Sequence, residues 1–356
     1  MVVNGLAVAT GVEVRTKDGA HHEILAKREV ILSAGAIQSP QILELSGIGR
    51  KSLLEKYGIP LVLEGPGVGE NLQDHAVSAQ CFEVADDQIS GDIMRDPNLV
   101  QAVLQQYMST KTGLLGGMLI SVTMLPLVDS KGRVSREEIA RLTEHYVNQE
   151  DLPLGQKRQY EQLQRQILGP KEATGLAEHF VRPNGDEGPA RTDKPKELHY
   201  DHGCQQPSIL VRLLPYQATN PEDKPILDPK YLSHPLDLEI LARQTQYIEM
   251  IVKTEPFASL LTPGGRSPEG REATTLEAAK EIVKESLLST FHPVGTCTMM
   301  PRELRGVVDS RLKVHGTKNL RVVDASIFPM EILGNIQATV CAVAEKAADL
   351  IIEDWK

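Results

Sequence analysis

The sequence is poor in cysteine and lacks the local patterns that mark a disulfide framework or a zinc site. Its four cysteines, Cys81, Cys204, Cys297 and Cys341, are widely separated, and no two form a C-x-x-C pair. This spacing argues against a zinc site and against a dense disulfide scaffold, so we expect free thiols. The absence of an Asn-x-Ser/Thr sequon also points away from a heavily glycosylated secreted protein.

The sequence also has neither a basic tract nor a long apolar run. The formal net charge is −10 at pH 7 and Lys/Arg runs do not exceed two or three residues, which disfavours nucleic-acid binding. No apolar stretch approaches the roughly 20 residues of a membrane span, and residues 1–20 lack the pattern of a signal peptide. We therefore expect a protein that acts on a small molecule, without a membrane span or export signal in the chain as given, and cytoplasmic by default.

Several enzyme signatures are missing as well. There is no G-x-S-x-G elbow, no H-E-x-x-H helix and no paired-carboxylate motif, so hydrolase and metalloenzyme functions gain no support and we predict no metal site. The glycines of residues 47–49 and 65–69 do not form G-x-G-x-x-G between a buried strand and a helix. We therefore reject both segments as phosphate-binding loops.

What is present is the composition of a folded protein of more than one domain. The chain has 356 residues, of which 41% are apolar and 24% are charged. These values are ordinary for globular proteins, and the length favours two domains with large buried interiors.

The first part of the chain predicts a strand, a turn of small residues and a helix. A hairpin with its turn at Asp18-Gly19 leads into the apolar run of residues 30–32, which ends at the small residues 33–36. Ser39 is then expected as N-cap with Pro40 at the first helical position, and the helix stops at Gly47. This order is typical of the edge of a nucleotide-binding sheet, where the backbone approaches a cofactor closely.

The middle of the chain is richer in charged helical patterns, and its end again predicts a strand and turn followed by a helix, as the beginning does. After the first helix, the predicted helices are residues 51–57, 135–148, 156–168, 236–254, 276–290 and 336–354. The predicted extended segments are residues 59–63, 209–214, 225–229 and 319–325. Asn335 is expected at the N-cap of the last helix, whose apolar residues form one stripe.

His292 lies in the most informative stretch, Phe-His-Pro-Val-Gly-Thr-Cys-Thr-Met over residues 291–299. Pro293 keeps His292 out of any helix, and a loop of this kind can present an imidazole to a cavity. A histidine with a pKa near neutrality can accept the proton of a substrate hydroxyl as a hydride leaves carbon. A purely structural role for a loop histidine is the competing interpretation.

Asn335 has two interpretations that are compatible with each other. It is a good N-cap residue, and the same helix start carries a partial positive charge that can stabilise an anionic ring while the amide binds a substrate oxygen. For His75, His315 and the pair His21-His22, structural or solvated roles are favoured.

Four ordered blocks together resemble the C-terminal part of a glucose-methanol-choline oxidoreductase, a flavin-dependent alcohol oxidase or dehydrogenase. The blocks are GAIQSPQILELSGIG at 35–49, VGENLQDH at 68–75, HPVGTCTM at 292–299, and the segment 322–340. The resemblance extends from about residue 10 to residue 356. It implies a mixed α/β and α+β fold: part of a Rossmann-like FAD-binding domain in residues 1–75, an antiparallel-sheet substrate domain with helices in 76–285, and a return to the FAD-binding domain in 286–356.

The resemblance also implies an activity and its residues. His292 matches the active-site base and Asn335 the residue that assists it. Asp324 and Ala325 match contacts to the ribityl and pyrophosphate region of FAD, whereas Asn335, Ile336 and Gln337 match the helix start that faces the flavin ring. A small-molecule alcohol would lose a proton to His292 and a hydride to flavin N5, and the electrons would pass to oxygen or to another acceptor.

The chain departs from the family at one point, because it has no N-terminal strand followed by G-x-G-x-x-G. That fingerprint holds the ADP half of FAD, and its absence suggests that roughly 200 or more preceding residues are missing. Two alternatives to an active alcohol oxidoreductase therefore stay open. One is a truncated, inactive fragment, and the other is a non-redox relative with lyase or cyclase chemistry.

Overall fold

A computed structural model of the chain describes residues 2–86, 88, 96–116, 120–129, 131–146, 152–169, 172–180, 197–204, 212–213, 225, 227–228, 230–267 and 270–356. The helices are α1 (Gly35–Leu45), α2 (Lys51–Lys56), α3 (Pro97–Thr110), α4 (Arg136–Tyr146), α5 (Leu154–Leu168), α6 (Pro235–Ile251), α7 (Leu276–Ser286) and α8 (Gln337–Asp354). The short 3₁₀ turns are η2 (Ala258–Leu260), η3 (Arg302–Leu304) and η4 (Ala325–Ile327).

The strands form one large antiparallel sheet and several small pairs. The strands are β1 (Val2–Val3), β2 (Leu6–Ala7), β3 (Gly11–Arg15), β4 (His21–Leu25), β5 (Val30–Leu32), β6 (Ile48–Gly49), β7 (Leu63–Glu64), β8 (Ala76–Val84), β9 (Ile120–Leu125), β10 (Gly175–Phe180), β11 (Glu197–Cys204), β12 (Arg212–Leu213), β13 (Leu227–Asp228), β14 (Leu261–Ser267), β15 (Leu287–Ser289) and β16 (Leu320–Val322).

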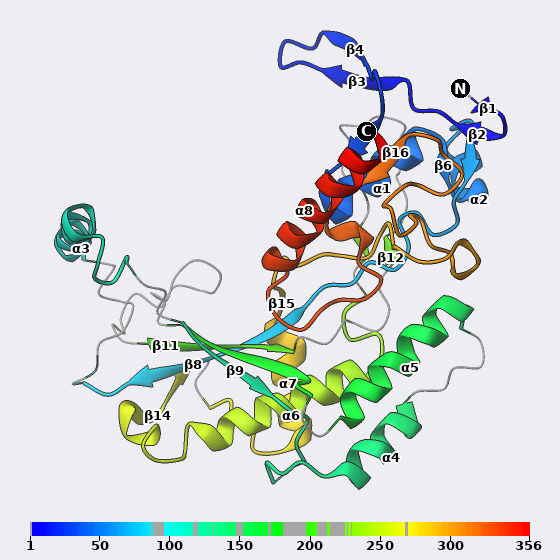
Figure 1. The fold of residues 1–356 in the computed structure, drawn as a ribbon. Coiled ribbons are helices and arrows are strands. Elements are labelled where there is room, and N and C mark those ends of the chain that lie inside the picture. The colour runs from blue at the N-terminus through cyan, green and yellow to red at the C-terminus, as the bar shows by residue number, and fades with distance from the viewer. Residues whose placement is uncertain are drawn as a thin grey trace.

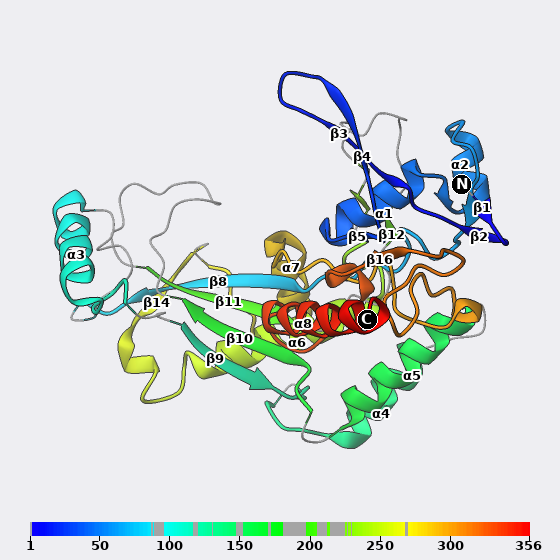
Figure 2. The same cartoon turned by 45° about the horizontal axis from the view of Figure 1, so that its top comes forward.

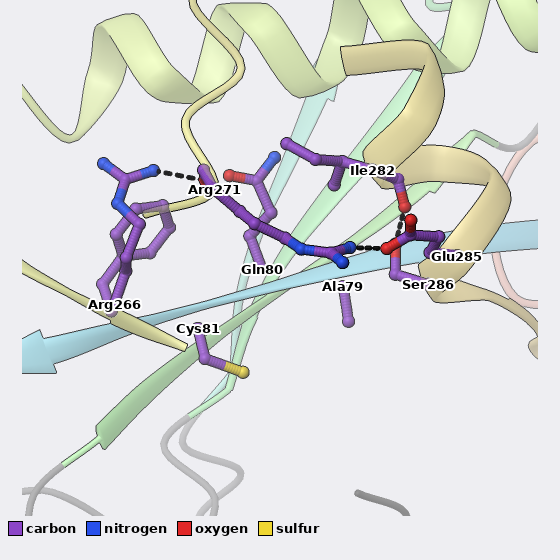
Figure 3. A pocket seen from close by; sticks show the side chains of 9 residues that line it. Ala79, Gln80, Cys81, Arg266, Arg271, Ile282, Glu285 and Ser286 are labelled. Atoms are coloured by element: carbon purple, nitrogen blue, oxygen red, sulfur yellow. Dashed lines mark hydrogen bonds and ion pairs between the residues drawn. The ribbon is translucent and has the colours of Figure 1, made fainter. Parts of the chain in front are cut away.

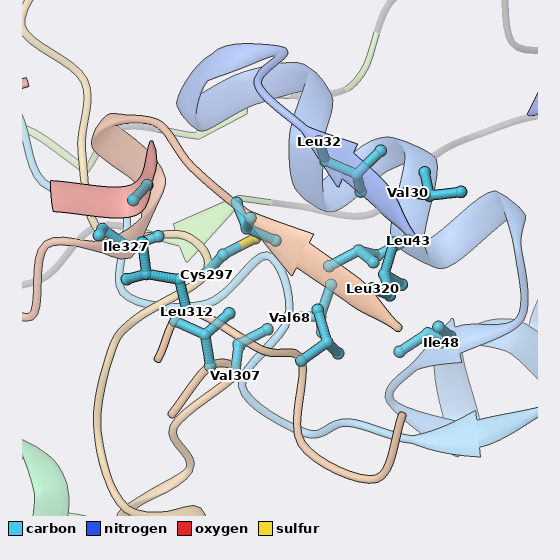
Figure 4. Packing of buried hydrophobic residues seen from close by; sticks show 14 of the residues in the cluster. Val30, Leu32, Leu43, Ile48, Val68, Cys297, Val307, Leu312, Leu320 and Ile327 are labelled. Carbon is cyan, nitrogen blue, oxygen red and sulfur yellow. The ribbon is translucent and has the colours of Figure 1, made fainter. Parts of the chain in front are cut away.

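The two ends of the chain build one hydrophobic core together. Strand β16 pairs in parallel with β5, 290 residues earlier, so that Leu320 lies opposite Val30 and Val322 opposite Leu32. Figure 4 shows this core, in which both strands pack with Leu43 of α1, and its buried members extend to Leu350 of α8. Because parallel strands point the same way, the turns that follow β5 and β16 meet at one edge.

The large sheet forms a second layer with cores of its own. Its order is β14-β8-β11-β10-β9, with β15 also paired to β8, and all these pairs are antiparallel. Helices α6 and α7 cover one face of the sheet, and α4 and α5 lie beside α6 (Figure 1). Two buried clusters in this part include Leu236 and Ile240 of α6, and Phe82 of β8.

Helix α8 extends from the core that the two chain ends build toward the large antiparallel sheet. Its C-terminal end lies among the elements of the first core, and its N-terminal end points toward the antiparallel sheet (Figure 1). The hairpin β3–β4 projects away from the body of the molecule in both views (Figure 2). All five residues of β4 are exposed, so this hairpin contributes little to the core.

The mixed α/β fold is as predicted. The turn at Asp18-Gly19, the strand 30–32, the positive φ of Gly47 after α1 and the helices α4, α5, α6 and α8 agree with the sequence analysis. The division at residues 75 and 285 remains a prediction, supported by the separate cores. The predicted strand 209–214 is described only at Arg212–Leu213, which pairs with β13 outside the large sheet, and the rest lies outside the described residues.

The predicted start of the first helix is wrong. Helix α1 begins at Gly35, so Ser39 and Pro40 lie inside it rather than at its N-cap and first position. Pro40 cannot donate the helical hydrogen bond to the carbonyl oxygen of Ala36. The Thr296 hydroxyl donates to that oxygen instead, at 2.6 Å, so a contact with a distant segment compensates for the proline.

The predicted helix 276–290 is too long at its C-terminal end. The backbone becomes extended at Leu287, and residues 287–289 form β15, which pairs with β8. Helical periodicity in the sequence does not show this change, because the strand is only three residues long.

No described helix combines the length and apolarity required to cross a membrane. Within the described ranges, no group of three or more His, Cys, Asp or Glu is placed to hold a metal ion. Cys81, Cys297 and Cys341 form no disulfide bond, whereas the side chain of Cys204 lies outside the described part of the structure.

Candidate functional site

The loop that carries His292 is held against the segment that precedes β8. The backbones of Val294 and Gln73 exchange two hydrogen bonds, of 2.8 and 3.0 Å, and the Thr290 N–H donates to the carbonyl oxygen of His75 at 3.1 Å. As predicted, His292 lies outside any helix, directly before Pro293. Two segments more than 200 residues apart in sequence therefore fix its position.

Asp74 ties the His292 backbone to its surroundings. Its carboxylate accepts hydrogen bonds from the His292 N–H at 2.9 Å, from the Ser289 hydroxyl at 2.5 Å and from the Tyr231 phenol. Burial raises the pKa of Tyr231, so its phenol keeps the proton that it donates. These three donors satisfy a carboxylate that is itself buried.

The His292 ring contacts a second histidine. The Nδ1 atoms of His292 and His75 are 2.9 Å apart, and the rings meet edge to face with 5.2 Å between centroids. His292 Nδ1 is also 3.1 Å from the Thr290 hydroxyl oxygen. No described residue forms a hydrogen bond with His292 Nε2, so this is the ring atom available to a ligand.

Burial keeps the His292 imidazole neutral near physiological pH. It lowers the pKa of His292 below the ordinary value of 6.5, and the negative charge of Asp74 opposes this shift in part. A neutral imidazole is the form that can accept a proton.

Behind His75 lies a buried carboxyl group. Glu331 Oε1 is 3.8 Å from His75 Nε2 and accepts a hydrogen bond from the Ile332 N–H at 3.1 Å, whereas Glu331 Oε2 is buried without a partner. Burial is the main cause that raises the pKa of Glu331 to about 9. Glu331 is therefore a neutral carboxylic acid at pH 7.

Asp324 joins the two turns that follow the parallel strands. Its Oδ2 accepts from the Gly35 N–H at 3.0 Å and from the Ser39 hydroxyl at 2.6 Å, while Oδ1 accepts from the Ser326 N–H at 2.8 Å and the Ser326 hydroxyl at 2.5 Å. Ala325 begins η4, directly after this carboxylate, and its carbonyl oxygen accepts from the Gly295 N–H at 3.3 Å. The sheet edge that is predicted to face a cofactor therefore also contains the hydrogen bonds that join the two ends of the chain to each other and to the His292 loop.

The predicted N-cap role of Asn335 is wrong by one residue. Helix α8 begins at Gln337 and Ile336 occupies the cap position, with helical φ and ψ and no side-chain cap hydrogen bond. Asn335 is exposed, and the described structure contains no hydrogen bond between Asn335 and His292. Gly334 precedes it with φ +95°, so the turn into α8 depends on a glycine conformation.

The cavity shown in Figure 3 is separate from these residues. It has a volume of about 250 Å³ and lies between β8 and α7, with Gln80, Phe82, Arg266, Arg271 and Ile282 in its lining. Arg271 pairs with Glu285 across it. Neither His292 nor Asn335 is in its lining, so it does not contribute to the predicted site.

His75 and Asp74 both contact His292, although sequence reasoning named neither of them as a site residue. A structural or solvated role was favoured for His75, which is fully buried and contacts His292. The available signal was its place beside Asp74, directly before a strand, but only the folded contact reveals which loop it faces. In contrast, His21 and His22 lie in the exposed hairpin, and His315 bonds a backbone carbonyl, as expected for structural or solvated residues.

Two family models match the chain, both described as GMC oxidoreductase. One covers residues 2–77 and the other residues 211–344, which together exceed half of the chain. The chain is 31% identical over 385 residues to "Dehydrogenase mpl7" of Monascus purpureus, an alignment that covers 99% of this chain and 58% of that protein. Human mitochondrial choline dehydrogenase is 31% identical over 347 residues, with 96% of this chain and 50% of the relative covered.

A solved structure supports the same assignment. The FAD-dependent oxidoreductase from Chaetomium thermophilum superposes with a TM-score of 0.84 at 25% identity, covering 99% of this chain and 60% of that chain. The present chain thus spans only about half the length of the curated relatives that it matches. With its site at the meeting point of two distant segments and both family models in order, the chain belongs to the GMC oxidoreductase family.

Proposed function

We propose that this chain carries the proton-accepting part of a FAD-dependent oxidoreductase that converts the CH–OH group of a small-molecule alcohol into a carbonyl group. The observation that carries the proposal is the state of His292. Its backbone and its Nδ1 are held by protein groups, its pKa is lowered by burial, and its Nε2 is available. This combination suits a base that takes one proton from a hydroxyl group.

The residues present fit the flavin half of FAD. The carboxyl ends of the parallel strands β5 and β16 share an edge, which is where dinucleotides bind in such sheets. Gly35, with φ +82°, has no atom within 4 Å of the place that a Cβ would occupy, so the backbone there is open to close approach. Asp324 and Ala325 would contact the ribityl and pyrophosphate region, and Asn335, Ile336 and Gln337 at the start of α8 would face the flavin ring.

Each residue of the proposed site has a separate task. His292 Nε2 accepts the proton of the substrate hydroxyl, and Asn335 donates an amide hydrogen bond to the same oxygen. The N-terminus of α8 adds a partial positive charge near that oxygen and the ring. FAD, when bound, would supply the hydride acceptor, and oxygen or another acceptor would take the electrons.

The relatives support the chemistry at the level of class. Human choline dehydrogenase is named for the oxidation of an alcohol, and the Chaetomium structure is named as FAD-dependent. The substrate of this chain is therefore proposed only as an alcohol of low molecular weight.

The test is anaerobic reduction of flavin by alcohols. The purified chain is supplied with FAD, freed of unbound flavin and mixed with a panel of primary and secondary alcohols while absorbance at about 450 nm is followed. We expect at least one alcohol to bleach the bound flavin. Flavin that binds but is reduced by no alcohol would favour the non-redox relative, and failure to bind flavin would favour an inactive fragment.

A further inference from the structure

The environment of His75 determines which of its ring nitrogens carries hydrogen. His75 is fully buried, and its Nε2 is 2.9 Å from the carbonyl oxygen of Ile332. A carbonyl oxygen can only accept a hydrogen bond, so His75 Nε2 must be the N–H donor. If the ring is neutral, His75 Nδ1 is then a lone-pair acceptor.

The groups around His75 favour its neutral form. Burial, together with the proximity of His292, lowers the pKa of His75 to about 3. The nearby Glu331 is protonated at pH 7 because its pKa is raised to about 9, so it offers no negative charge to a protonated ring. The Asp74 carboxylate is directed at Tyr231, Ser289 and the His292 N–H.

The second neighbour of the His292 ring is also an acceptor. The Thr290 hydroxyl donates to the carbonyl oxygen of His75 at 3.1 Å, which leaves its oxygen lone pairs for His292 Nδ1. His292 Nδ1 thus faces two acceptors, His75 Nδ1 at 2.9 Å and Thr290 Oγ1 at 3.1 Å. Only an N–H at His292 Nδ1 satisfies both contacts.

We propose that His75 is a positioning residue that holds His292 in the tautomer with hydrogen on Nδ1 and a lone pair on Nε2. Without such partners a neutral imidazole would populate both tautomers, and in one of them Nε2 could not accept a proton. The order of contacts runs from the Ile332 carbonyl through His75 to His292. The functional importance of this tautomer rests on the proposed role of His292 as base.

The test reads the tautomer directly and needs no flavin. The full chain is labelled with ¹⁵N-histidine, and two-bond ¹H–¹⁵N correlations at neutral pH identify the protonated nitrogen of each ring. Signals are assigned by their loss in His292→Gln and His315→Gln. His315 is a built-in control, because its Nε2 bonds the carbonyl oxygen of Met300 at 3.0 Å and should be the opposite, Nε2–H tautomer.

In the wild-type chain we expect His292 to be predominantly Nδ1–H. His75→Phe removes the acceptor and should shift the tautomer ratio of His292 by roughly fivefold toward Nε2–H, the worth of one hydrogen bond. His75→Asn places an amide oxygen near the former Nδ1 and should restore most of the ratio. The His315 signal should not change in either variant.

Two results would overturn the proposal. One is a wild-type His292 that is mainly Nε2–H or doubly protonated at neutral pH, which can be seen even if His75→Phe fails to fold. The other is a change of less than about twofold in a folded His75→Phe variant. Loss of alcohol oxidation would instead contradict the proposed function and leave the tautomer result intact.

Discussion

At the scale of residues, burial sets the charge state of the groups behind His292. His75 and Glu331 both lose their charge at neutral pH, one through a lowered pKa and the other through a raised pKa. A neutral pair avoids the desolvation cost of two buried charges that lack strong partners.

The raised pKa of Glu331 should make stability depend on pH. The folded pKa of about 9 exceeds the ordinary value of 4.5, so between these values the native state binds a proton that the unfolded state has lost. This contribution is complete below the unfolded pKa and is lost as pH rises through the folded pKa, with a slope of up to about 1.4 kcal/mol per pH unit.

Glu331→Gln removes this titration and should flatten the decline of unfolding free energy between about pH 5 and pH 9. The measurement is urea denaturation of both proteins across that range. Glu345→Gln, on the exposed part of α8, is the matched control and should follow the wild type. Parallel curves for Glu331→Gln and wild type would show that Glu331 is not neutral in the folded protein.

Sequence reasoning identified His292 at this scale but could not choose its tautomer. The Pro-Gly context of residues 292–295 predicted a loop that presents the ring, and the structure has that loop. The partner His75 lies 217 residues earlier in the sequence, so the contact depends on the way that the two segments pack. Local pattern carries no information about such a pairing.

At the scale of elements, the position at which α8 begins decides what a substitution of Asn335 measures. Because Ile336 and not Asn335 occupies the cap position, replacing the Asn335 side chain removes no cap hydrogen bond. The effect on stability and the effect on catalysis can then be separated.

Asn335→Ala should change the unfolding free energy by less than about 0.5 kcal/mol and slow flavin reduction by at least about tenfold. Urea denaturation and anaerobic flavin reduction are measured on the same preparation. Glu345→Ala on the same helix should alter neither quantity. A destabilised but equally fast Asn335→Ala enzyme would assign Asn335 a structural role only.

Strand β8 shows why one central element was missed. Buried and half-buried residues alternate along β8, but Ser78 and Gln80 occupy two of the buried positions and weaken the apolar pattern. Their polar groups are satisfied by partners from α7 and α6, such as the hydroxyl of Ser286 at 2.7 Å from that of Ser78. A strand whose inward side chains are polar is not visible to hydrophobic periodicity.

At the scale of the whole molecule, the chain is closed by contacts between its ends. The parallel pairing of β5 with β16 and the Asp324 hydrogen bonds join residues that are almost 300 positions apart. The small-residue turn after β5 and an extended segment at residues 319–325 were each predicted, but their side-by-side arrangement follows from the common core shown in Figure 4. Both the proposed cofactor edge and the His292 loop depend on these contacts between the two ends of the chain.

The claim that His292 is the base is tested most directly by anaerobic, single-turnover flavin reduction in His292→Ala. His22→Ala, in the exposed hairpin, is the control, and bound flavin is quantified in each protein. We expect His292→Ala to bind as much flavin as the wild type but to be reduced by alcohol at least about 100-fold more slowly, with His22→Ala unchanged. A loss smaller than about tenfold in His292→Ala would show that His292 is not the base.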